Sequence, residues 1–201
     1  MNNENLVIVF TKNPVLGKCK TRLAKSIGQK KALYVYEDLL EHTRNTLSKT
    51  PYQVAVFYSE YVDWDDAWNK QYQKKTQAKG HLGEKMKKAF EWAFEQDYKK
   101  VVLIGTDLLD LETSDLKKSF ELLTTNELIV GPAEDGGYYL IGMKALINEA
   151  FTFKKWSTNS VLKTTLEDCQ AHQVKLLEYK NDIDNLDDLK KSNYDLKKIG
   201  F

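Results

Sequence analysis

The feature that most constrains the fold of this chain is the recurrence of short, uninterrupted apolar runs. The first run, NLVIVFT at 5–11, is rich in β-branched residues and ends in a loop that contains Pro14 and Gly17. Such a run is typical of a strand buried on both faces, because no position in it is reserved for water. Similar runs, or an alternation of apolar and polar residues, predict further strands at 52–59, 100–105, 127–131, 138–143 and 173–180.

Helical patterns lie between the predicted strands. Residues 20–49 have a helical composition with a predicted break near Gly28, and residues 82–96 carry apolar side chains along one face. Two more helices are predicted, one near 113–124 and one that starts at Trp156. Strands that alternate with helices predict an α/β domain whose central sheet is mostly parallel and flanked by helices.

The length of 201 residues predicts one domain, here 1–201, because a chain of this size can bury most of its apolar surface around a single core. The sequence contains no internal repeat, low-complexity tract or linker that would mark a domain boundary. Within the sheet we expect the strand at 5–11 to be central and the segment 131–143 to add an antiparallel excursion.

The overall charge disfavours two classes of partner. The 30 Lys and Arg residues nearly balance the 29 Asp and Glu residues, so the net charge of +1 favours neither nucleic acid nor a membrane surface.

The apolar run near the start is too short for a signal peptide, and no run is long enough to predict a membrane span. Cys19 and Cys169 lack metal-ligand spacing and are expected to be free thiols. These observations predict a cytoplasmic protein.

Positive charge gathers directly after the first predicted strand. Residues 11–36 contain seven Lys or Arg and no Asp or Glu. A glycine in the loop allows close backbone approach, and a helix start presents amide groups to an anion. The segment GKCKT is not a Walker A loop, because it lacks the early glycine and has a cysteine where Ser or Thr is required. We predict a phosphate site, with a solvated basic helix face as the alternative; the predicted contacts are Thr11, Lys12, Gly17, Lys20 and Arg22.

Carboxylates follow other predicted strands. Asp107 comes directly after the strand at 100–105, and Asp182 and Asp184 follow the last strand. Ligands bind at the carboxyl ends of strands in open α/β sheets, and carboxylates there can hold Mg²⁺ or Mn²⁺. Local roles are the alternatives: Asp107 as a turn or cap residue, Asp184 as the cap of the next helix, and Asp135 as part of a plain DGG hairpin turn. No metal is assigned to the histidines, which lack ligand spacing: His42, His81 and His172.

Several of these segments together resemble a known family. They are the basic loop after the first strand, LGEKMKKAF, LIGTD, GPAEDGGYYLIG, WSTNSVLKTT and DIDNLDDL. Over residues 5 to about 190 they resemble the glycosyltransferase-A-fold family of uncharacterised bacterial radical-SAM/selenodomain-associated transferases, which are nucleotide-diphospho-sugar transferase-like. The resemblance implies a Rossmann-like domain that binds a nucleotide or nucleotide sugar through a divalent metal. It assigns the metal to Asp107 and Asp184 and places Gly83 at the nucleotide.

Three functions are compatible with this set of residues. The first is a metal-dependent transferase acting on a nucleotide sugar, in which Asp107 and Asp184 hold Mg²⁺ or Mn²⁺. Lys20 and Arg22 would then neutralise the charge on the leaving phosphates, and Asp135 would contact the sugar or act as a base. The second is a nucleotidylyltransferase, in which Lys20 steadies the α-phosphate while pyrophosphate leaves.

The third function is a non-catalytic nucleotide-binding module. It is motivated by a departure from the family pattern, because Leu108 and Leu109 follow Asp107 where the family usually has a cysteine and a proline. The base, the sugar, the acceptor and the oligomeric state are not defined by the sequence.

Overall fold

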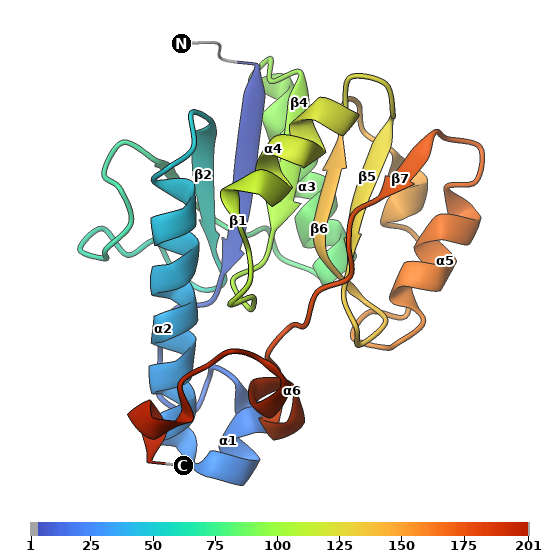
Figure 1. Cartoon of the computed structure of the whole chain (residues 1–201). Helices are drawn as coiled ribbons and strands as arrows, with labels where there is room; N and C mark the ends of the chain where they lie inside the picture. The colour runs from blue at the N-terminus through green and yellow to red at the C-terminus, as the bar shows by residue number, and fades with distance from the viewer. Residues whose placement is uncertain (1–3, 201) are drawn as a thin grey trace.

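A seven-stranded sheet forms the centre of the computed structural model, which describes residues 4–200. Its strands are β1 (Asn5–Thr11), β2 (Gln53–Tyr58), β3 (Gln73–Thr76), β4 (Lys100–Ile104), β5 (Leu128–Pro132), β6 (Tyr138–Met143) and β7 (Val174–Leu176). They lie in the order β3-β2-β1-β4-β6-β5-β7 (Figure 1). All neighbouring strands are parallel except β6, which runs antiparallel to both β4 and β5. The expected mostly parallel sheet and its antiparallel excursion are confirmed.

Two details of the sheet differ from expectation. β1 is an interior strand between β2 and β4, but β4 rather than β1 is the middle strand. The edge strand β3 was not expected, because its sequence QKKT has no apolar run and none of its residues is buried. It forms by pairing with the buried strand β2, and such pairing cannot be recognised from the residues of β3 alone.

Helices cover both faces of the sheet (Figure 1). They are α1 (Thr21–Ile27), α2 (Gln29–Leu47), α3 (Leu82–Glu95), α4 (Thr113–Leu122), α5 (Val161–Asp168) and α6 (Leu186–Lys191), with short 3₁₀ turns at Asn148–Ala150 and Leu196–Ile199. α2 and α4 pack on the face that carries Val7 and Val9, while α3 and α5 pack on the face that carries Leu6 and Ile8. Both faces of β1 are therefore buried, which explains its continuous apolar sequence.

The predicted break near Gly28 is confirmed. Gly28 has a φ of +84°, ends α1 and precedes α2 directly, which suits glycine because it adopts positive φ without steric cost. The helix predicted from Trp156 was placed too early. It starts instead at Val161, and Ser157 has a φ of +63°, which is incompatible with a right-handed helix.

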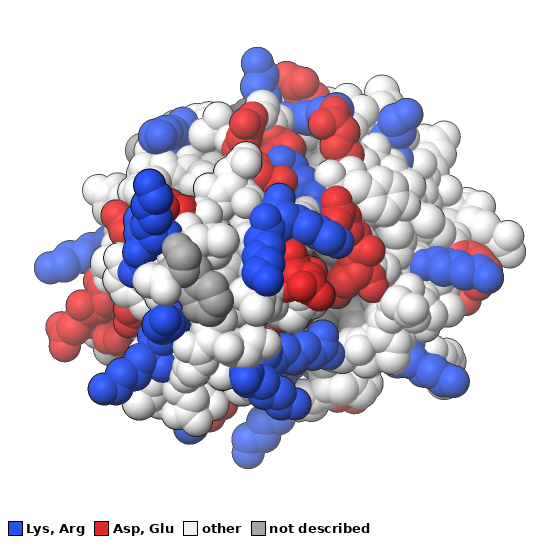
Figure 2. Space-filling view, turned by 60° about the horizontal axis from the view of Figure 1, so that its bottom comes forward, with Lys and Arg blue, Asp and Glu red and all other residues white. Residues whose placement is uncertain are grey.

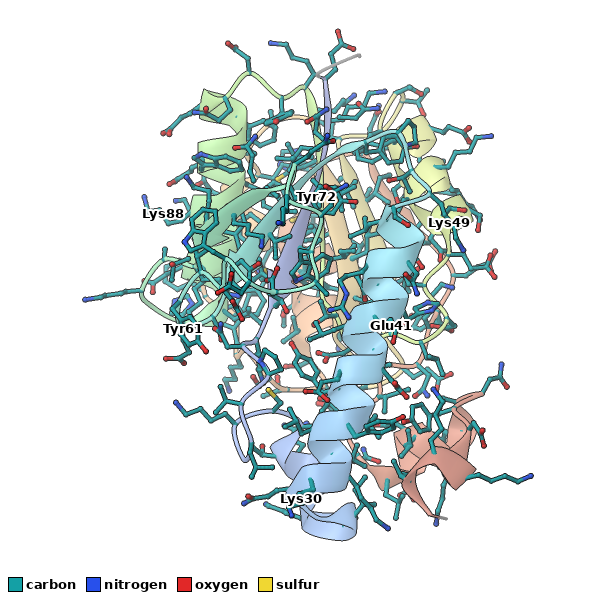
Figure 3. The ribbon with its side chains drawn as sticks, turned by 90° about the vertical axis from the view of Figure 1, so that its left-hand side faces the viewer. Lys30, Glu41, Lys49, Tyr61, Tyr72 and Lys88 are labelled. Carbon is teal, nitrogen blue, oxygen red and sulfur yellow. The ribbon has the colours of Figure 1, made fainter. Side chains whose placement is uncertain are left out.

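A smaller third core lies beyond the carboxyl ends of β1 and β4, at the bottom of Figure 1. It joins α1, α6, the last 3₁₀ turn and the first half of α2. Figure 3 shows α2 from outside, extending from the end that carries Lys30 towards Lys49 just past its other end. Ile183 and Leu189 pack in this core with Leu23 of α1. The packing fixes the segment after β7 against α1.

Candidate nucleotide and cation site

Three chain segments meet around the side chain of Lys20. Lys20 caps the start of α1, and its side chain is only 2% exposed. Its Nζ lies 2.5 Å from Asp107 Oδ1 and 3.4 Å from Asp184 Oδ1. Asp107 follows β4 and Asp184 follows β7, so the expected approach of these two distant carboxylates is observed. Their role as metal ligands stays a prediction.

Backbone contacts hold the two acidic segments together. The amide of Ile183 donates to the carbonyl of Asp107 at 3.0 Å. The amide of Asp184 donates to Asp188 Oδ2 at 3.1 Å, and the side chain of Asn185 caps α6. The suggested cap role of Asp184 is therefore wrong, because the adjacent asparagine accepts the helix amides. The Asp184 carboxylate instead faces Lys20 and Arg22.

Arg22 lies on the solvent side of this cluster. Its Nη1 is 3.7 Å from Asp184 Oδ2, and its side chain is 62% exposed. A contact this long and this exposed contributes little stability. The guanidinium can therefore turn to a ligand at low cost.

Charges around Lys20 favour its protonated form. Burial alone would lower the pKa of Lys20, but the carboxylates of Asp107 and Asp184 outweigh burial and raise that pKa above its usual value. Asp182 is also buried, and its Oδ1 has no hydrogen-bond partner in the described part of the chain. Burial, followed by the nearby charge of Asp107, raises the pKa of Asp182 well above its usual range.

The hydroxyl of Tyr36 ties the loop after β1 to the loop after β4. It accepts a hydrogen bond from the amide of Lys12 at 2.8 Å and donates to the Lys12 carbonyl at 3.0 Å. It also lies 3.3 Å from the hydroxyl oxygens of Thr11 and Thr106. Burial, and then the charge of Asp107, raises the pKa of Tyr36 to about 12, so the phenol stays neutral near pH 7.

Sequence reasoning missed this role of Tyr36. Tyr36 belongs to α2, and its ring packs in the core there. Helical spacing predicts which face of the helix carries the ring, but it does not predict the hydrogen-bond partners of the hydroxyl group. Thr11 at the end of β1 and Thr106 just past β4 were the available signal, because buried hydroxyl groups require polar partners.

A cavity of about 460 Å³ opens beside the cluster and has a polar end and an apolar wall. The polar end is lined by Thr11, Lys12, Arg22, Tyr36, Asp107, Asp135, Asp182 and Asp184. The apolar wall is lined by Phe10, Leu82, Met86, Leu103, Trp156 and Val161. Figure 2 turns this end of the molecule forward and shows Lys and Arg side chains next to a group of Asp and Glu side chains. The arrangement suits a ligand with both a charged and an apolar part.

The predicted glycines have local structural roles. Gly17 has a φ of +77°, and a Cβ there would lie 3.3 Å from Gln29 Oε1 at the start of α2. A Cβ on Gly83 would lie 2.4 Å from Cζ2 of Trp156, so this glycine lets the indole pack on the first turn of α3. Neither glycine is among the described residues that line the cavity. Their contact with nucleotide stays a prediction.

Asp135 lies at the rim of the cavity in the turn between β5 and β6. Its Oδ1 accepts a hydrogen bond from the Gly137 amide at 2.8 Å, so it also has the turn role considered from the sequence. The loop after β4 is anchored by Leu108, which is 2% exposed and packs in the core shared by α2 and α4. This packing holds the loop, in which the resemblance led us to expect a proline at Leu109.

The donor chemistry around Asp107 fits a hard divalent cation, although Lys20 now contacts the same oxygens. Asp107 and Asp184 are each about 40% exposed, and Asp182 lines the same cavity. Oxygen ligands of this kind suit Mg²⁺ or Mn²⁺. Within residues 4–200, no group of three or more His, Cys, Asp or Glu is already arranged to hold a metal ion. A cation bound through Oδ1 of Asp107 or of Asp184 would require Lys20 to move, because its ammonium contacts both of these oxygens.

Comparison with known proteins identifies a family and structures with the same fold. The model of a family described as an uncharacterized protein conserved in bacteria, DUF2064, matches residues 42–158. A crystal structure from Desulfovibrio desulfuricans G20, of a protein proposed to be a nucleotide-diphospho-sugar transferase, is 30% identical with a TM-score of 0.87. The alignment covers 97% of this chain and 90% of that one. No curated protein matches.

More distant solved structures share the fold. The 4-diphosphocytidyl-2C-methyl-D-erythritol synthase from Anaerococcus prevotii DSM 20548 is 12% identical with a TM-score of 0.62, and the alignment covers 96% of both chains. Rv0371c from Mycobacterium tuberculosis H37Rv, solved in complex with manganese, is 12% identical with a TM-score of 0.52, covering 94% of this chain and 97% of that one. At these identities the likeness establishes the fold alone.

Proposed function

The chain belongs to the DUF2064 family, and on that premise we propose that it is a transferase that acts on a nucleotide sugar with the help of Mg²⁺ or Mn²⁺. The observation that carries the proposal is the convergence of Lys20, Asp107 and Asp184 beyond the carboxyl ends of β1 and β4, to which the segment after β7 returns. Ligand sites of open α/β sheets lie at this edge. The relative from Desulfovibrio desulfuricans G20, which is proposed to be a nucleotide-diphospho-sugar transferase, supports the assignment.

Several residues of the polar end would each bind a different part of the phosphate groups. Arg22 is exposed and can rotate onto a phosphate, while the Lys12 amide is held in place by Tyr36. When bound between Asp107 and Asp184, a divalent cation would supply charge neutralisation for the diphosphate. Asp135, which lines the same cavity, would contact the sugar or accept a proton from the acceptor.

Nucleotidylyl transfer is the second candidate. It is favoured by the shared fold with 4-diphosphocytidyl-2C-methyl-D-erythritol synthase and by the buried ammonium of Lys20, which could steady an α-phosphate. A non-catalytic binding module receives less support, because Leu108 anchors the loop that lacks the family's proline.

Product analysis separates these functions. A thermal-shift screen of nucleotides and nucleotide sugars, with and without Mn²⁺, would first find a ligand; at ~100 times its dissociation constant it should stabilise the protein by about 2.7 kcal/mol. Release of a nucleoside diphosphate then supports glycosyl transfer, and release of pyrophosphate supports nucleotidylyl transfer. Tight binding without any product would contradict both.

Three narrower expectations stay predictions: an association with radical-SAM proteins, a cytoplasmic location, and the identity of base, sugar and acceptor. Both cysteines are buried free thiols, and no helix within residues 4–200 is long and apolar enough to cross a membrane.

A further inference from the structure

Lys20 lies where a divalent cation would have to bind. Its ammonium contacts Asp107 Oδ1 at 2.5 Å and Asp184 Oδ1 at 3.4 Å, and both carboxylates open onto the cavity. We propose that Lys20 is a built-in counterion that keeps divalent cations off these carboxylates until phosphate groups draw its ammonium away. Cation binding would then depend on phosphate binding. The inference rests on the proposed function for the kind of ligand, but its test does not require catalysis.

The carboxylates need a counterion when no ligand is bound. Asp107 and Asp184 both contact the Lys20 ammonium, at 2.5 and 3.4 Å, so their carboxylates lie close together at the polar end of the cavity. Like charges placed this closely repel each other unless a cation lies between them. Lys20 is the buried cation in contact with the cluster, whereas Arg22 is 62% exposed and 3.7 Å from its nearest carboxylate oxygen.

An ammonium and a metal ion compete for the same oxygen. Mg²⁺ requires carboxylate oxygens at ~2.1 Å, and the Lys20 ammonium already lies in contact with Asp107 Oδ1. Two positive ions on one carboxylate oxygen repel each other strongly in a partly buried site. The free protein is therefore expected to bind divalent cations weakly, even though it has suitable ligands.

The backbone conformation of Lys20 indicates that surrounding contacts hold this residue in place. Its φ of 46° and ψ of 46° are left-handed, a conformation that a lysine adopts at a cost. Such a conformation persists where surrounding contacts over-determine it. A phosphate bound near Arg22 would offer the ammonium a new partner and release the carboxylates. Phosphate and cation should therefore each raise the affinity for the other.

The test measures Mn²⁺ binding alone, by electron paramagnetic resonance of free Mn²⁺ at neutral pH. Lys20→Met keeps the unbranched shape and most of the length of the side chain and removes its charge; it should bind Mn²⁺ at least tenfold more tightly than the parent protein. Lys25→Met is the matched control, because it removes the same charge from an exposed residue of α1, the helix that begins after Lys20. It should bind Mn²⁺ like the parent. Equal or weaker Mn²⁺ binding by Lys20→Met than by the parent overturns the inference.

A second measurement covers the case in which Lys20→Met folds poorly. Thermal unfolding is followed in EDTA and in millimolar MnCl₂. Mn²⁺ should replace the missing ammonium and raise the Tm of Lys20→Met by more than it raises the Tm of the parent or of Lys25→Met. A variant that Mn²⁺ does not rescue contradicts the inference.

The same set of variants distinguishes the inference from the proposed function. A parent protein that forms product, combined with a Lys20→Met variant that gains no Mn²⁺ affinity, refutes the inference alone. A parent that forms no product from any nucleotide sugar refutes the proposed function, while a gain of Mn²⁺ affinity in Lys20→Met still supports the counterion.

Discussion

Tyr36→Phe should destabilise the protein and weaken nucleotide binding together. The substitution keeps the buried ring and removes the hydroxyl that bonds the amide and the carbonyl of Lys12 at 2.8 and 3.0 Å. A neutral hydrogen bond contributes ~1 kcal/mol net, and a buried group left without its partner costs ~1 to 3 kcal/mol. We therefore expect the free energy of unfolding to fall by about 1 to 3 kcal/mol.

Urea denaturation measures this change, with Tyr34→Phe as the matched control. Tyr34 is on the same helix but is 44% exposed, so its substitution should change the free energy of unfolding by less than about 0.5 kcal/mol. The affinity for the best nucleotide of the thermal-shift screen should also fall in Tyr36→Phe, because the loop with Lys12 loses its anchor. If Tyr36→Phe is as stable as Tyr34→Phe and binds nucleotide like the parent, the hydroxyl does not organise the site.

Each of the remaining predictions concerns a single residue. Arg22→Ala should lower nucleotide affinity about ten- to a hundredfold in titration calorimetry, because it removes a charge-assisted bond of roughly 1.5 to 3 kcal/mol, and unchanged affinity would contradict a phosphate role. Lys20→Ala should also lower the free energy of unfolding measured in EDTA, by about 1 to 3 kcal/mol, whereas Arg22→Ala should not. The partner carboxylates of Lys20 are about 40% exposed, so this loss should be smaller than for a fully buried ion pair. Gly83→Ala should cost about 1 to 3 kcal/mol in urea denaturation, since its Cβ would lie 2.4 Å from the ring of Trp156; parent-like stability would show that the indole can shift freely. Burial raises the pKa of Cys169 to about 11, so the native thiol should resist alkylation at pH 8 and react once urea unfolds the chain. Because the folded protein keeps this proton longer than the unfolded chain, stability should fall as pH rises between about 9 and 11, and a Cys169→Ser variant should lose that part of the pH dependence.

The parts of the fold that follow from buried apolar runs could be predicted from sequence. β1 is apolar at consecutive positions because helices cover both of its faces, and α3 shows its stripe because only one side meets the sheet. β3 could not be predicted, since its stability comes from pairing with β2 rather than from its own residues. The late start of α5 depends on the left-handed conformation of Ser157, for which the sequence offers no signal.

The site could be predicted only in part. The position of Asp107 follows from a general property of open α/β sheets, whose ligand sites lie at the carboxyl ends of the strands. Asp184 reaches Asp107 because the segment after β7 returns to pack on α1. The burial of Lys20 between them does not follow, since a lysine in a basic loop looks the same whether it is solvated or paired. Its contacts depend on a left-handed backbone and on α6 packing against α1.

The most direct test of the account is a crystal structure with Mn²⁺ and the best nucleotide found by the thermal-shift screen. Anomalous scattering locates Mn²⁺ independently of the rest of the density. The account predicts Mn²⁺ between the carboxylates of Asp107 and Asp184, with the phosphates on the side of Lys20 and Arg22. Nucleotide bound elsewhere, or Mn²⁺ that contacts neither carboxylate while Lys20 keeps its place, would contradict it.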